Sequence, residues 1–149
     1  MKIIALQGRP NCGKTTVITK LYQKLCALYK RRLYKPNNQD GDFTAIFEID
    51  THTVGITSIG DYQNDLIEPF EIMENNHCQL CVVCCHTKHT KGGSKLFVES
   101  KAKQYNVDVV WYTKGYIEQH NAKYDLGKEI DEINDIQAKI LLQEILKQI

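Results

Sequence analysis

The residues with the clearest chemistry run from Gly8 to Thr15 and read Gly-Arg-Pro-Asn-Cys-Gly-Lys-Thr. The two glycines let backbone N–H groups turn inward and form a concave anion-binding site. Lys14 adds a positive charge, and the Thr15 hydroxyl is an oxygen ligand of the kind that Mg²⁺ prefers. A helix beginning here would point the positive end of its dipole at the same anion. The stretch therefore predicts a polyphosphate-binding loop.

This loop matches the pattern G-x-x-x-x-G-K-[ST] at every fixed position, between an apolar run and a helical pattern. In these residues the chain resembles the P-loop NTPase superfamily, and elsewhere it does so only in layout. The resemblance implies that Lys14 contacts the β- and γ-phosphates and that Thr15 binds Mg²⁺. It also implies that the nucleotide is held by Gly8, Arg9, Pro10, Asn11, Cys12, Gly13, Lys14, Thr15 and Thr16.

Length and composition predict one domain spanning residues 1–149, because a chain of this size can bury its own core. A hydrophobic content of 42% and a charged content of 25% are ordinary for a globular protein. The net charge of +1 gives no indication of nucleic-acid or membrane binding. The sequence shows no membrane-span or signal-peptide pattern, so we expect a cytoplasmic protein whose cysteines stay reduced.

Strand and helix patterns alternate along the chain and predict the elements that position the loop. The expected strands are Lys2–Leu6, 32–35, Phe43–Ile49, Val54–Ile59, Gln79–Cys85 and Val107–Tyr112. The expected helices are Lys14–Tyr29, Leu66–Glu74, Ser94–Tyr105 and one from about Glu129 onward. This order predicts a three-layer α/β/α P-loop NTPase fold with a mostly parallel sheet. Only four residues separate Ile49 from Val54, so these two strands should form an antiparallel hairpin.

Details of the helices follow from spacing and residue type. We expect Pro69 in the first turn of its helix, Ser94 as an N-cap, and Arg31 and Arg32 closing the first helix. Apolar residues at helical spacing predict the buried faces. These are Val17, Ile18, Leu21, Leu25 and Leu28 on the first helix, and Ile130, Ile133, Ile136, Ile140, Leu141 and Ile145 on the last.

P-loop enzymes also need an acidic residue near Mg²⁺ at the end of a neighbouring strand. Asp50 and Asp61 are the two candidates. The hairpin reverses the strand before Asp50 and sends that residue to the opposite edge of the sheet. The strand before Asp61 connects through helical crossovers to further parallel strands, which places Asp61 at the ligand-binding edge. We therefore assign Asp61 to the metal and to catalysis, with a helix-capping turn residue as the alternative.

The same topology brings the loop 36–42 close to the phosphates. Its position resembles that of a nucleotide-sensing loop in the regulatory GTPases, which implies that Asp40, Asp42 or Thr44 approaches Mg²⁺ or the nucleophile. The alternative is a solvated surface loop. The later stretch Gly60 to Gln63 resembles the second sensing loop only loosely, because the pattern D-x-x-G is absent.

The residues that follow the strand Gln79–Cys85 indicate which nucleotide base the protein binds. GTPases usually recognise guanine there with the pattern N-K-x-D. Lys88 matches the lysine, but Thr87 replaces the asparagine and Thr90 stands where the aspartate belongs. Because that aspartate supplies the hydrogen bonds that reject adenine, its absence favours ATP over GTP.

The basic segment 86–95 leads into the next helix at the same edge. Gly92, Gly93 and Ser94 could form a second anion site with Lys88 or Lys91. The alternative is a solvated loop with an ordinary helix cap.

Four cysteines between residues 78 and 85 suggest a metal site at first sight. Cys81 and Cys84 lie three residues apart on one predicted strand and so point to opposite faces. A zinc site usually pairs two separate knuckles, and no separate second C-x₂-C exists, so we expect these cysteines to be buried apolar residues.

Three functions fit this sequence. The first is a P-loop protein that binds ATP or GTP with Mg²⁺ and hydrolyses it, with Gln63 or a residue of the loop 36–42 orienting water. The second is a kinase that transfers the γ-phosphoryl group to a small-molecule acceptor. The third is a nucleotide-binding switch or subunit without turnover of its own, whose protein partner supplies a catalytic arginine.

Overall fold

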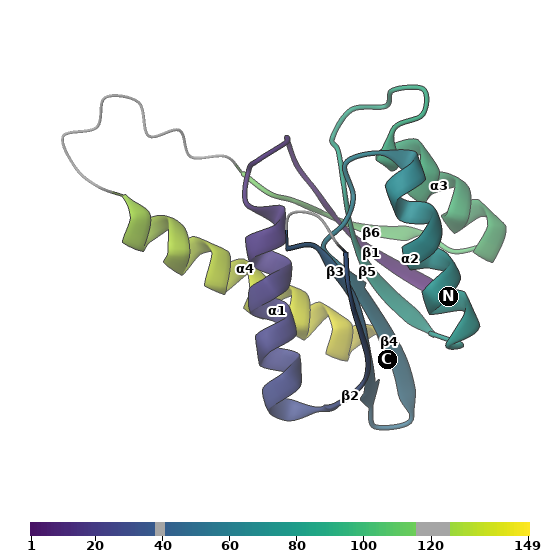
Figure 1. Ribbon diagram of the computed structural model, residues 1–149, viewed down its shortest axis with the longest axis horizontal. Coiled ribbons are helices and arrows are strands. Elements are labelled where there is room, and N and C mark those ends of the chain that lie inside the picture. The colour runs from purple at the N-terminus through teal and green to yellow at the C-terminus, as the bar shows by residue number, and fades with distance from the viewer. Residues whose placement is uncertain (38–40, 116–125) are drawn as a thin grey trace.

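The computed structural model describes residues 1–37, 41–115 and 126–149. Within these ranges the chain forms an α/β fold with four helices and a mixed sheet of six strands (Figure 1). None of these helices is both long enough and apolar enough to cross a bilayer. In chain order the elements are β1 (Lys2–Gln7), α1 (Lys14–Leu28), β2 (Lys30–Pro36), β3 (Phe43–Ile49), β4 (His52–Thr57), α2 (Gln63–Asn75), β5 (Leu80–Cys85), α3 (Ser94–Tyr105), β6 (Val109–Thr113) and α4 (Gly127–Gln148).

The sheet has the strand order β2-β3-β4-β5-β1-β6. Strands β4, β5, β1 and β6 pair in parallel, whereas β3 is antiparallel to both of its neighbours. Strand β3 is thus the one reversed strand, and the predicted hairpin is confirmed. Its reversal means that the start of β3 lies at the sheet edge where the parallel strands end. Asp42, directly before β3, therefore shares this edge with the Gly8–Thr15 loop.

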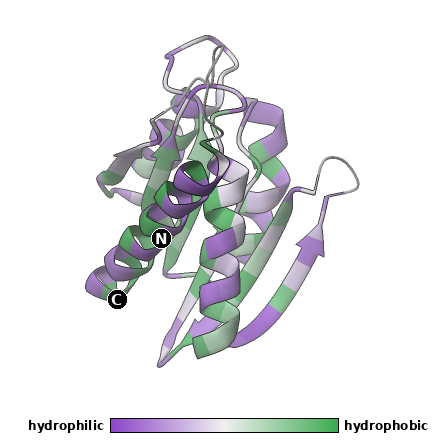
Figure 2. Ribbon diagram, turned by 90° about the vertical axis from the view of Figure 1, so that its left-hand side faces the viewer, coloured by the Kyte–Doolittle hydropathy of each residue, from purple (hydrophilic) through white to green (hydrophobic). Residues whose placement is uncertain are grey.

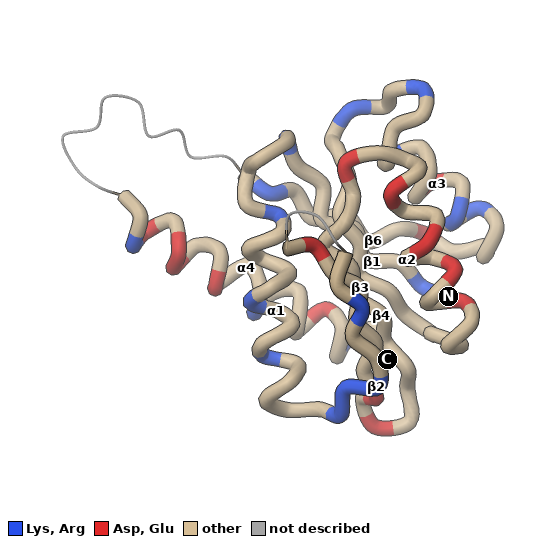
Figure 3. Tube along the Cα trace, in the orientation of Figure 1, with Lys and Arg blue, Asp and Glu red and all other residues tan. Residues whose placement is uncertain are grey.

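Two apolar clusters hold helices against opposite faces of the sheet. The helices α1 and α4 pack on one face through residues such as Leu21 and Leu141, against Phe47 of the sheet. The helices α2 and α3 pack on the other face through Phe70 and Val98. Figure 2 shows that apolar residues are concentrated in strands inside the sheet. The helices carry both apolar and polar residues. Ion pairs also join α1 to α4, from Lys20 to Asp131 and from Lys24 to Asp135. Figure 3 shows basic residues along α1 and acidic residues along α4.

The buried faces of the first and last helices differ in part from the prediction. Leu28 is 62% exposed because it ends α1, and the next residue, Tyr29, packs against the core instead. Ile136 and Ile140 are 54% and 41% exposed. The face that α4 buries is centred about a third of a turn from these two isoleucines. It carries Asn134, Ala138, Leu141, Glu144 and Ile145.

Three predictions about helix ends were wrong. Arg31 and Arg32 do not close α1 but lie in β2. Helix α2 begins at Gln63, so Pro69 lies beyond its first turn. That early start is stabilised by the Asp65 carboxylate, which accepts a hydrogen bond from the Tyr62 N–H at 3.2 Å. In α3 the N-cap is Gly93, and Ser94 is the first helical residue.

The cysteines of β5 are part of the core. Cys81 belongs to the cluster under α2 and α3, and Cys84 belongs to the cluster under α1 and α4. This confirms that they face opposite sides of the sheet. Burial raises the pKa of Cys85, and of Cys78 just before the strand, to about 12. These thiols behave as small apolar residues of the core.

Candidate functional site

The Gly8–Thr15 loop connects β1 to α1, and a side chain would be strained at one of its two glycines and crowded at the other. Gly13 has a φ of 99°, in the left-handed region that favours glycine. A β-carbon on Gly8 would lie only 2.6 Å from Cys12 Sγ. The Gly8 N–H donates to the Cys85 carbonyl at 3.0 Å, which fixes the loop to the end of β5.

Lys14 is folded back over this loop. Its side chain is buried, and Nζ donates to the carbonyl oxygens of Gly8 at 3.0 Å and of Arg9 at 2.8 Å. The ammonium group is therefore held against the loop by two neutral acceptors. Two carbonyls do not neutralise a buried positive charge, so this position favours an anion beside it.

A hollow of about 580 Å³ opens in front of the loop, at the edge of the sheet where the parallel strands end. We call it the front hollow. Three segments line it: the start of α1, the loop before β3, and the connection from β4 to α2. Its lining residues are Asn11, Gly13, Lys14, Thr15, Thr16, Asn37, Asp42, Ser58, Ile59, Gly60, Asp61, Tyr62 and Asp65.

The front hollow collects most of the predicted phosphate-binding residues. Asn11, Gly13, Lys14, Thr15 and Thr16 line it. The remaining four have other positions. Gly8 lies under Lys14, Arg9 and Pro10 are exposed, and Cys12 is buried behind the loop.

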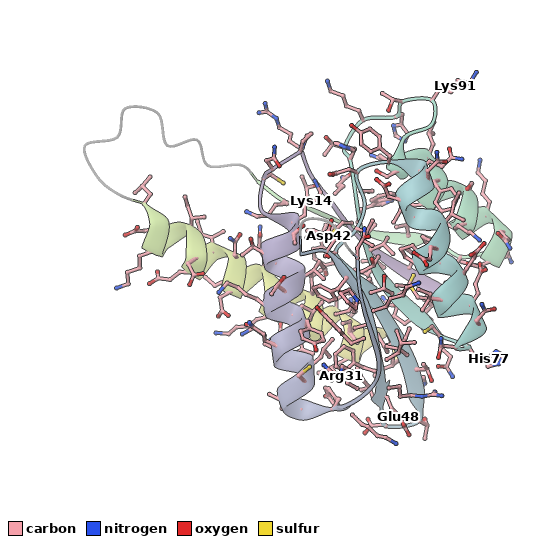
Figure 4. The ribbon with its side chains drawn as sticks, in the orientation of Figure 1. Lys14, Arg31, Asp42, Glu48, His77 and Lys91 are labelled. Carbon is pink, nitrogen blue, oxygen red and sulfur yellow. The ribbon has the colours of Figure 1, made fainter. Side chains whose placement is uncertain are left out.

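Asp42 is the carboxylate in contact with the Thr15 hydroxyl. Its Oδ1 atom accepts hydrogen bonds from Thr15 Oγ1 at 3.2 Å and from Ser58 Oγ at 2.9 Å. Figure 4 shows Asp42 beside Lys14 at the beginning of α1. The contact with Ser58 exists because β3 is reversed, so that the residue before β3 and the residue after β4 are neighbours. Three oxygen-bearing side chains thereby meet at one point.

Of the other two candidates, the structure describes only Thr44, and it is not at this point. Thr44 is buried within the hairpin, where Oγ1 donates to Thr57 Oγ1 at 3.1 Å. Asp40 lies outside the described residues. The sequence named Asp42 only as one of three candidate residues. It could not single out Asp42, because the hydrogen bond from Ser58 that holds the carboxylate in place joins residues far apart in the chain.

Asp61 lines the same hollow but is directed elsewhere. Its side chain is 59% exposed, and Oδ1 lies 3.7 Å from His86 Nε2. It thus lies at the rim, facing the 86–95 segment, while Asp42 contacts Thr15. Asp50 is in the turn between β3 and β4, at the opposite end of these strands. Strand directions therefore separate the two predicted acids as expected.

The 86–95 segment uses its backbone groups for internal contacts. The Gly93 N–H donates to the Thr90 carbonyl at 2.8 Å, and the Gln63 N–H donates to the Gly92 carbonyl at 3.2 Å. The Ser94 hydroxyl accepts from the His86 N–H at 2.9 Å and is fully buried. These bonds fasten the segment to the start of α2. They favour the helix-leading loop over a second anion site.

A second hollow, which no sequence motif indicates, lies behind the loop. This rear hollow has a volume of about 240 Å³. Its lining residues are Asn11, Cys12, Gly13, Thr16, Lys114, Ile130, Ile133 and Asn134. Lys114 follows β6 and Asn134 lies on α4, in parts of the chain whose local pattern carries no binding motif. Both residues pack against Gly13, since a β-carbon there would lie 3.4 Å from Lys114 Cε and 3.5 Å from Asn134 Oδ1.

Comparison of this chain with protein-family models, curated proteins and solved structures gives no match. The chemistry open to the site follows from its own groups. A buried ammonium, a turned backbone and a helix N-terminus attract a polyphosphate. The hydroxyl and carboxylate oxygens of Thr15, Asp42 and Ser58 are hard ligands that suit Mg²⁺.

Proposed function

We propose that this chain is a P-loop protein of three-layer α/β/α architecture that binds a nucleoside triphosphate with Mg²⁺ and hydrolyses it. The observation that carries the proposal is the contact between Thr15 and Asp42 beside the buried Lys14. It places an ammonium group, a hydroxyl and a carboxylate around one hollow at the end of the parallel strands. In open α/β sheets, ligands bind at that edge.

Phosphate binding in this proposal uses groups already in position. Lys14 Nζ exchanges its contacts with the Gly8 and Arg9 carbonyls for phosphate oxygens, while the α1 backbone stays in place. Each new contact joins a cation to an anion and is stronger than the bond to a neutral carbonyl. The binding energy therefore comes mainly from charge.

The metal would be held by oxygen atoms at the mouth of the front hollow. Thr15 Oγ1 and Asp42 Oδ1 are the direct ligands in this proposal, because they are adjacent and both face the hollow. Asp61 at the rim would reach the metal through water, which Mg²⁺ retains readily. When bound, Mg²⁺ neutralises charge that develops on the β- and γ-phosphates.

Hydrolysis would then depend on positioning and electrostatics. A water molecule in the front hollow attacks the γ-phosphorus, the bond to the β-phosphate oxygen breaks, and inorganic phosphate leaves. Gln63 does not line this hollow, whereas the carboxylates of Asp42, Asp61 and Asp65 do and can orient the water. No arginine lines it among the described residues either. We therefore expect slow turnover by the isolated chain.

Replacing Asp42 by asparagine tests the metal assignment. The substitution keeps the shape and removes the charge, so nucleotide should still bind but with a weaker response to Mg²⁺. We expect the Mg²⁺ concentration for half-maximal activity to rise about tenfold or more, because a charge-assisted contact of about 1.5–3 kcal/mol is lost. Phosphate release measured over a Mg²⁺ titration gives the value.

Asp61→Asn is the matched control for that experiment. It removes the same charge from the rim and should change the Mg²⁺ requirement less than Asp42→Asn. A larger effect at Asp61 would reverse the two roles. Equal and negligible effects would rule out both carboxylates as metal ligands.

A kinase is the second candidate, and the extent of the front hollow favours it. The hollow continues past Thr15 to Asp61, Tyr62 and Asp65, which leaves space beyond the phosphates for a hydroxyl-bearing acceptor. Phosphate release without any acceptor would support hydrolysis. Nucleotide that stays intact until a small-molecule acceptor is added would support the kinase, and intact nucleotide under all conditions would support the switch.

A further inference from the structure

The rear hollow shares its wall with the front hollow. Asn11, Gly13 and Thr16 line both, so the two spaces meet at the first turn of α1. A nucleotide is an elongated ligand, with charged phosphates at one end and a flat, mostly apolar base at the other. If the phosphates occupy the loop and the terminal phosphate faces Asp42, the base must leave on another side.

The chemistry of the rear hollow differs from that of the front. Ile130 and Ile133 of α4 give it apolar walls, whereas the front hollow is lined by three carboxylates. Four of its eight lining residues have polar side chains, and of these only Lys114 and Asn134 are buried. A hollow with apolar walls and a few fixed polar groups suits a small organic ring system.

Asn134 is the residue that requires an explanation. It is 95% buried, and Oδ1 has no hydrogen-bond partner among the described residues. A buried amide oxygen without a partner is costly and rare in folded proteins. Its position on the wall of the rear hollow means that a ligand there could supply the missing donor.

We propose that the rear hollow is the base subsite of this nucleotide-binding protein and that Asn134 selects adenine. This inference rests on the proposed function. An asparagine amide pairs with adenine through two hydrogen bonds, since it accepts from the N6 amine and donates to N7. The N6 amine thereby satisfies Oδ1, and the two isoleucines contact the faces of the ring. Lys114 packs against Gly13 and supports the loop between the two subsites.

The test compares two ligands that share their phosphates. ATP and inorganic tripolyphosphate, each with Mg²⁺, are titrated by calorimetry into the wild-type chain and into Asn134→Leu. The ratio of their affinities measures the contribution of the nucleoside alone. We expect the ratio of ATP affinity to tripolyphosphate affinity to be about tenfold higher in the wild-type chain than in Asn134→Leu. The affinity for tripolyphosphate itself should be the same in both.

Gln137→Leu is the matched control. Gln137 lies one turn further along α4 and also has a buried amide oxygen without a partner among the described residues, but it does not line the rear hollow. Its replacement should leave the affinity ratio at the wild-type value. If Gln137→Leu lowers the affinity ratio as much as Asn134→Leu does, the packing of α4, and not a contact with the base, is responsible for the loss of ATP affinity.

A second measurement needs no variant. Purine riboside triphosphate lacks the N6 amine, so it should bind the wild-type chain about tenfold more weakly than ATP. Equal binding of the two would overturn the adenine assignment, as would a GTP preference that Asn134→Leu abolishes. An unchanged ratio in Asn134→Leu, with tripolyphosphate still bound, would overturn the subsite alone. Failure of the wild-type chain to bind either ligand would instead overturn the proposed function.

Discussion

Lys14→Ala is expected to abolish measurable binding of the nucleoside triphosphate. In the structure Nζ is held over the loop by two carbonyls, and in the proposed complex it contacts phosphate oxygens. Losing two charge-assisted hydrogen bonds costs about 3–6 kcal/mol, which corresponds to about a hundredfold or more in Kd. The fold itself should persist, because the Gly8 and Arg9 carbonyls can be hydrated from the front hollow. Calorimetric titration with Mg²⁺ and nucleotide measures the change.

Lys91→Ala provides the comparison for this result. Lys91 is exposed on the 86–95 segment and lines neither hollow, and Figure 4 shows it far from Lys14. The two variants carry the same net charge, so a general electrostatic effect would weaken both equally. Affinity retained in Lys14→Ala would contradict the proposed phosphate site.

The second large effect is expected from Gly60→Ala, which tests the packing under the site. A β-carbon at residue 60 would lie 2.0 Å from the carbonyl oxygen of Cys84 and 2.8 Å from its Cβ. These atoms belong to the buried strand β5 and cannot turn aside. The connection from β4 to α2 must move instead, and it carries Ser58 and Asp61. We expect a loss of about 3 kcal/mol or more in the free energy of unfolding, measured by denaturant titration.

Gly115→Ala is the corresponding control for stability. Residue 115 is exposed, and an added β-carbon there would meet no atom of the described residues within 4 Å. Its unfolding free energy should stay within about 0.5 kcal/mol of wild type. If Gly60→Ala unfolds at the same denaturant concentration as this control, the close approach of residue 60 to β5 is not required for the fold.

The order of elements was predictable because it depends on local patterns. Period-two and period-3.6 spacing of apolar residues marked the strands and helices, and the short link after Ile49 marked the reversal of β3. Helix ends were less predictable. The cap on α2 uses the backbone N–H of Tyr62, and tyrosine is not among the residues that signal a helix start.

The site was predictable only as far as it is contiguous in sequence. The Gly8–Thr15 loop carries its own signature, whereas the choice of Asp42 depends on a bond from Ser58, sixteen residues away. The contacts of Lys114 and Asn134 with Gly13 join positions about a hundred residues apart. Asn134 is polar and was not among the apolar residues predicted to face the core, yet α4 buries it.

The distribution of cysteines makes this protein suitable for thiol labelling without mutagenesis. Five of its six cysteines are buried, and Cys26, on the outer side of α1, is the exposed one. A dye attached there would sit on the helix that begins with Lys14 and would leave the core thiols unmodified under native conditions. Slow reaction at the buried Cys12 would then report each opening of the phosphate loop, and a bound nucleotide should slow that reaction further.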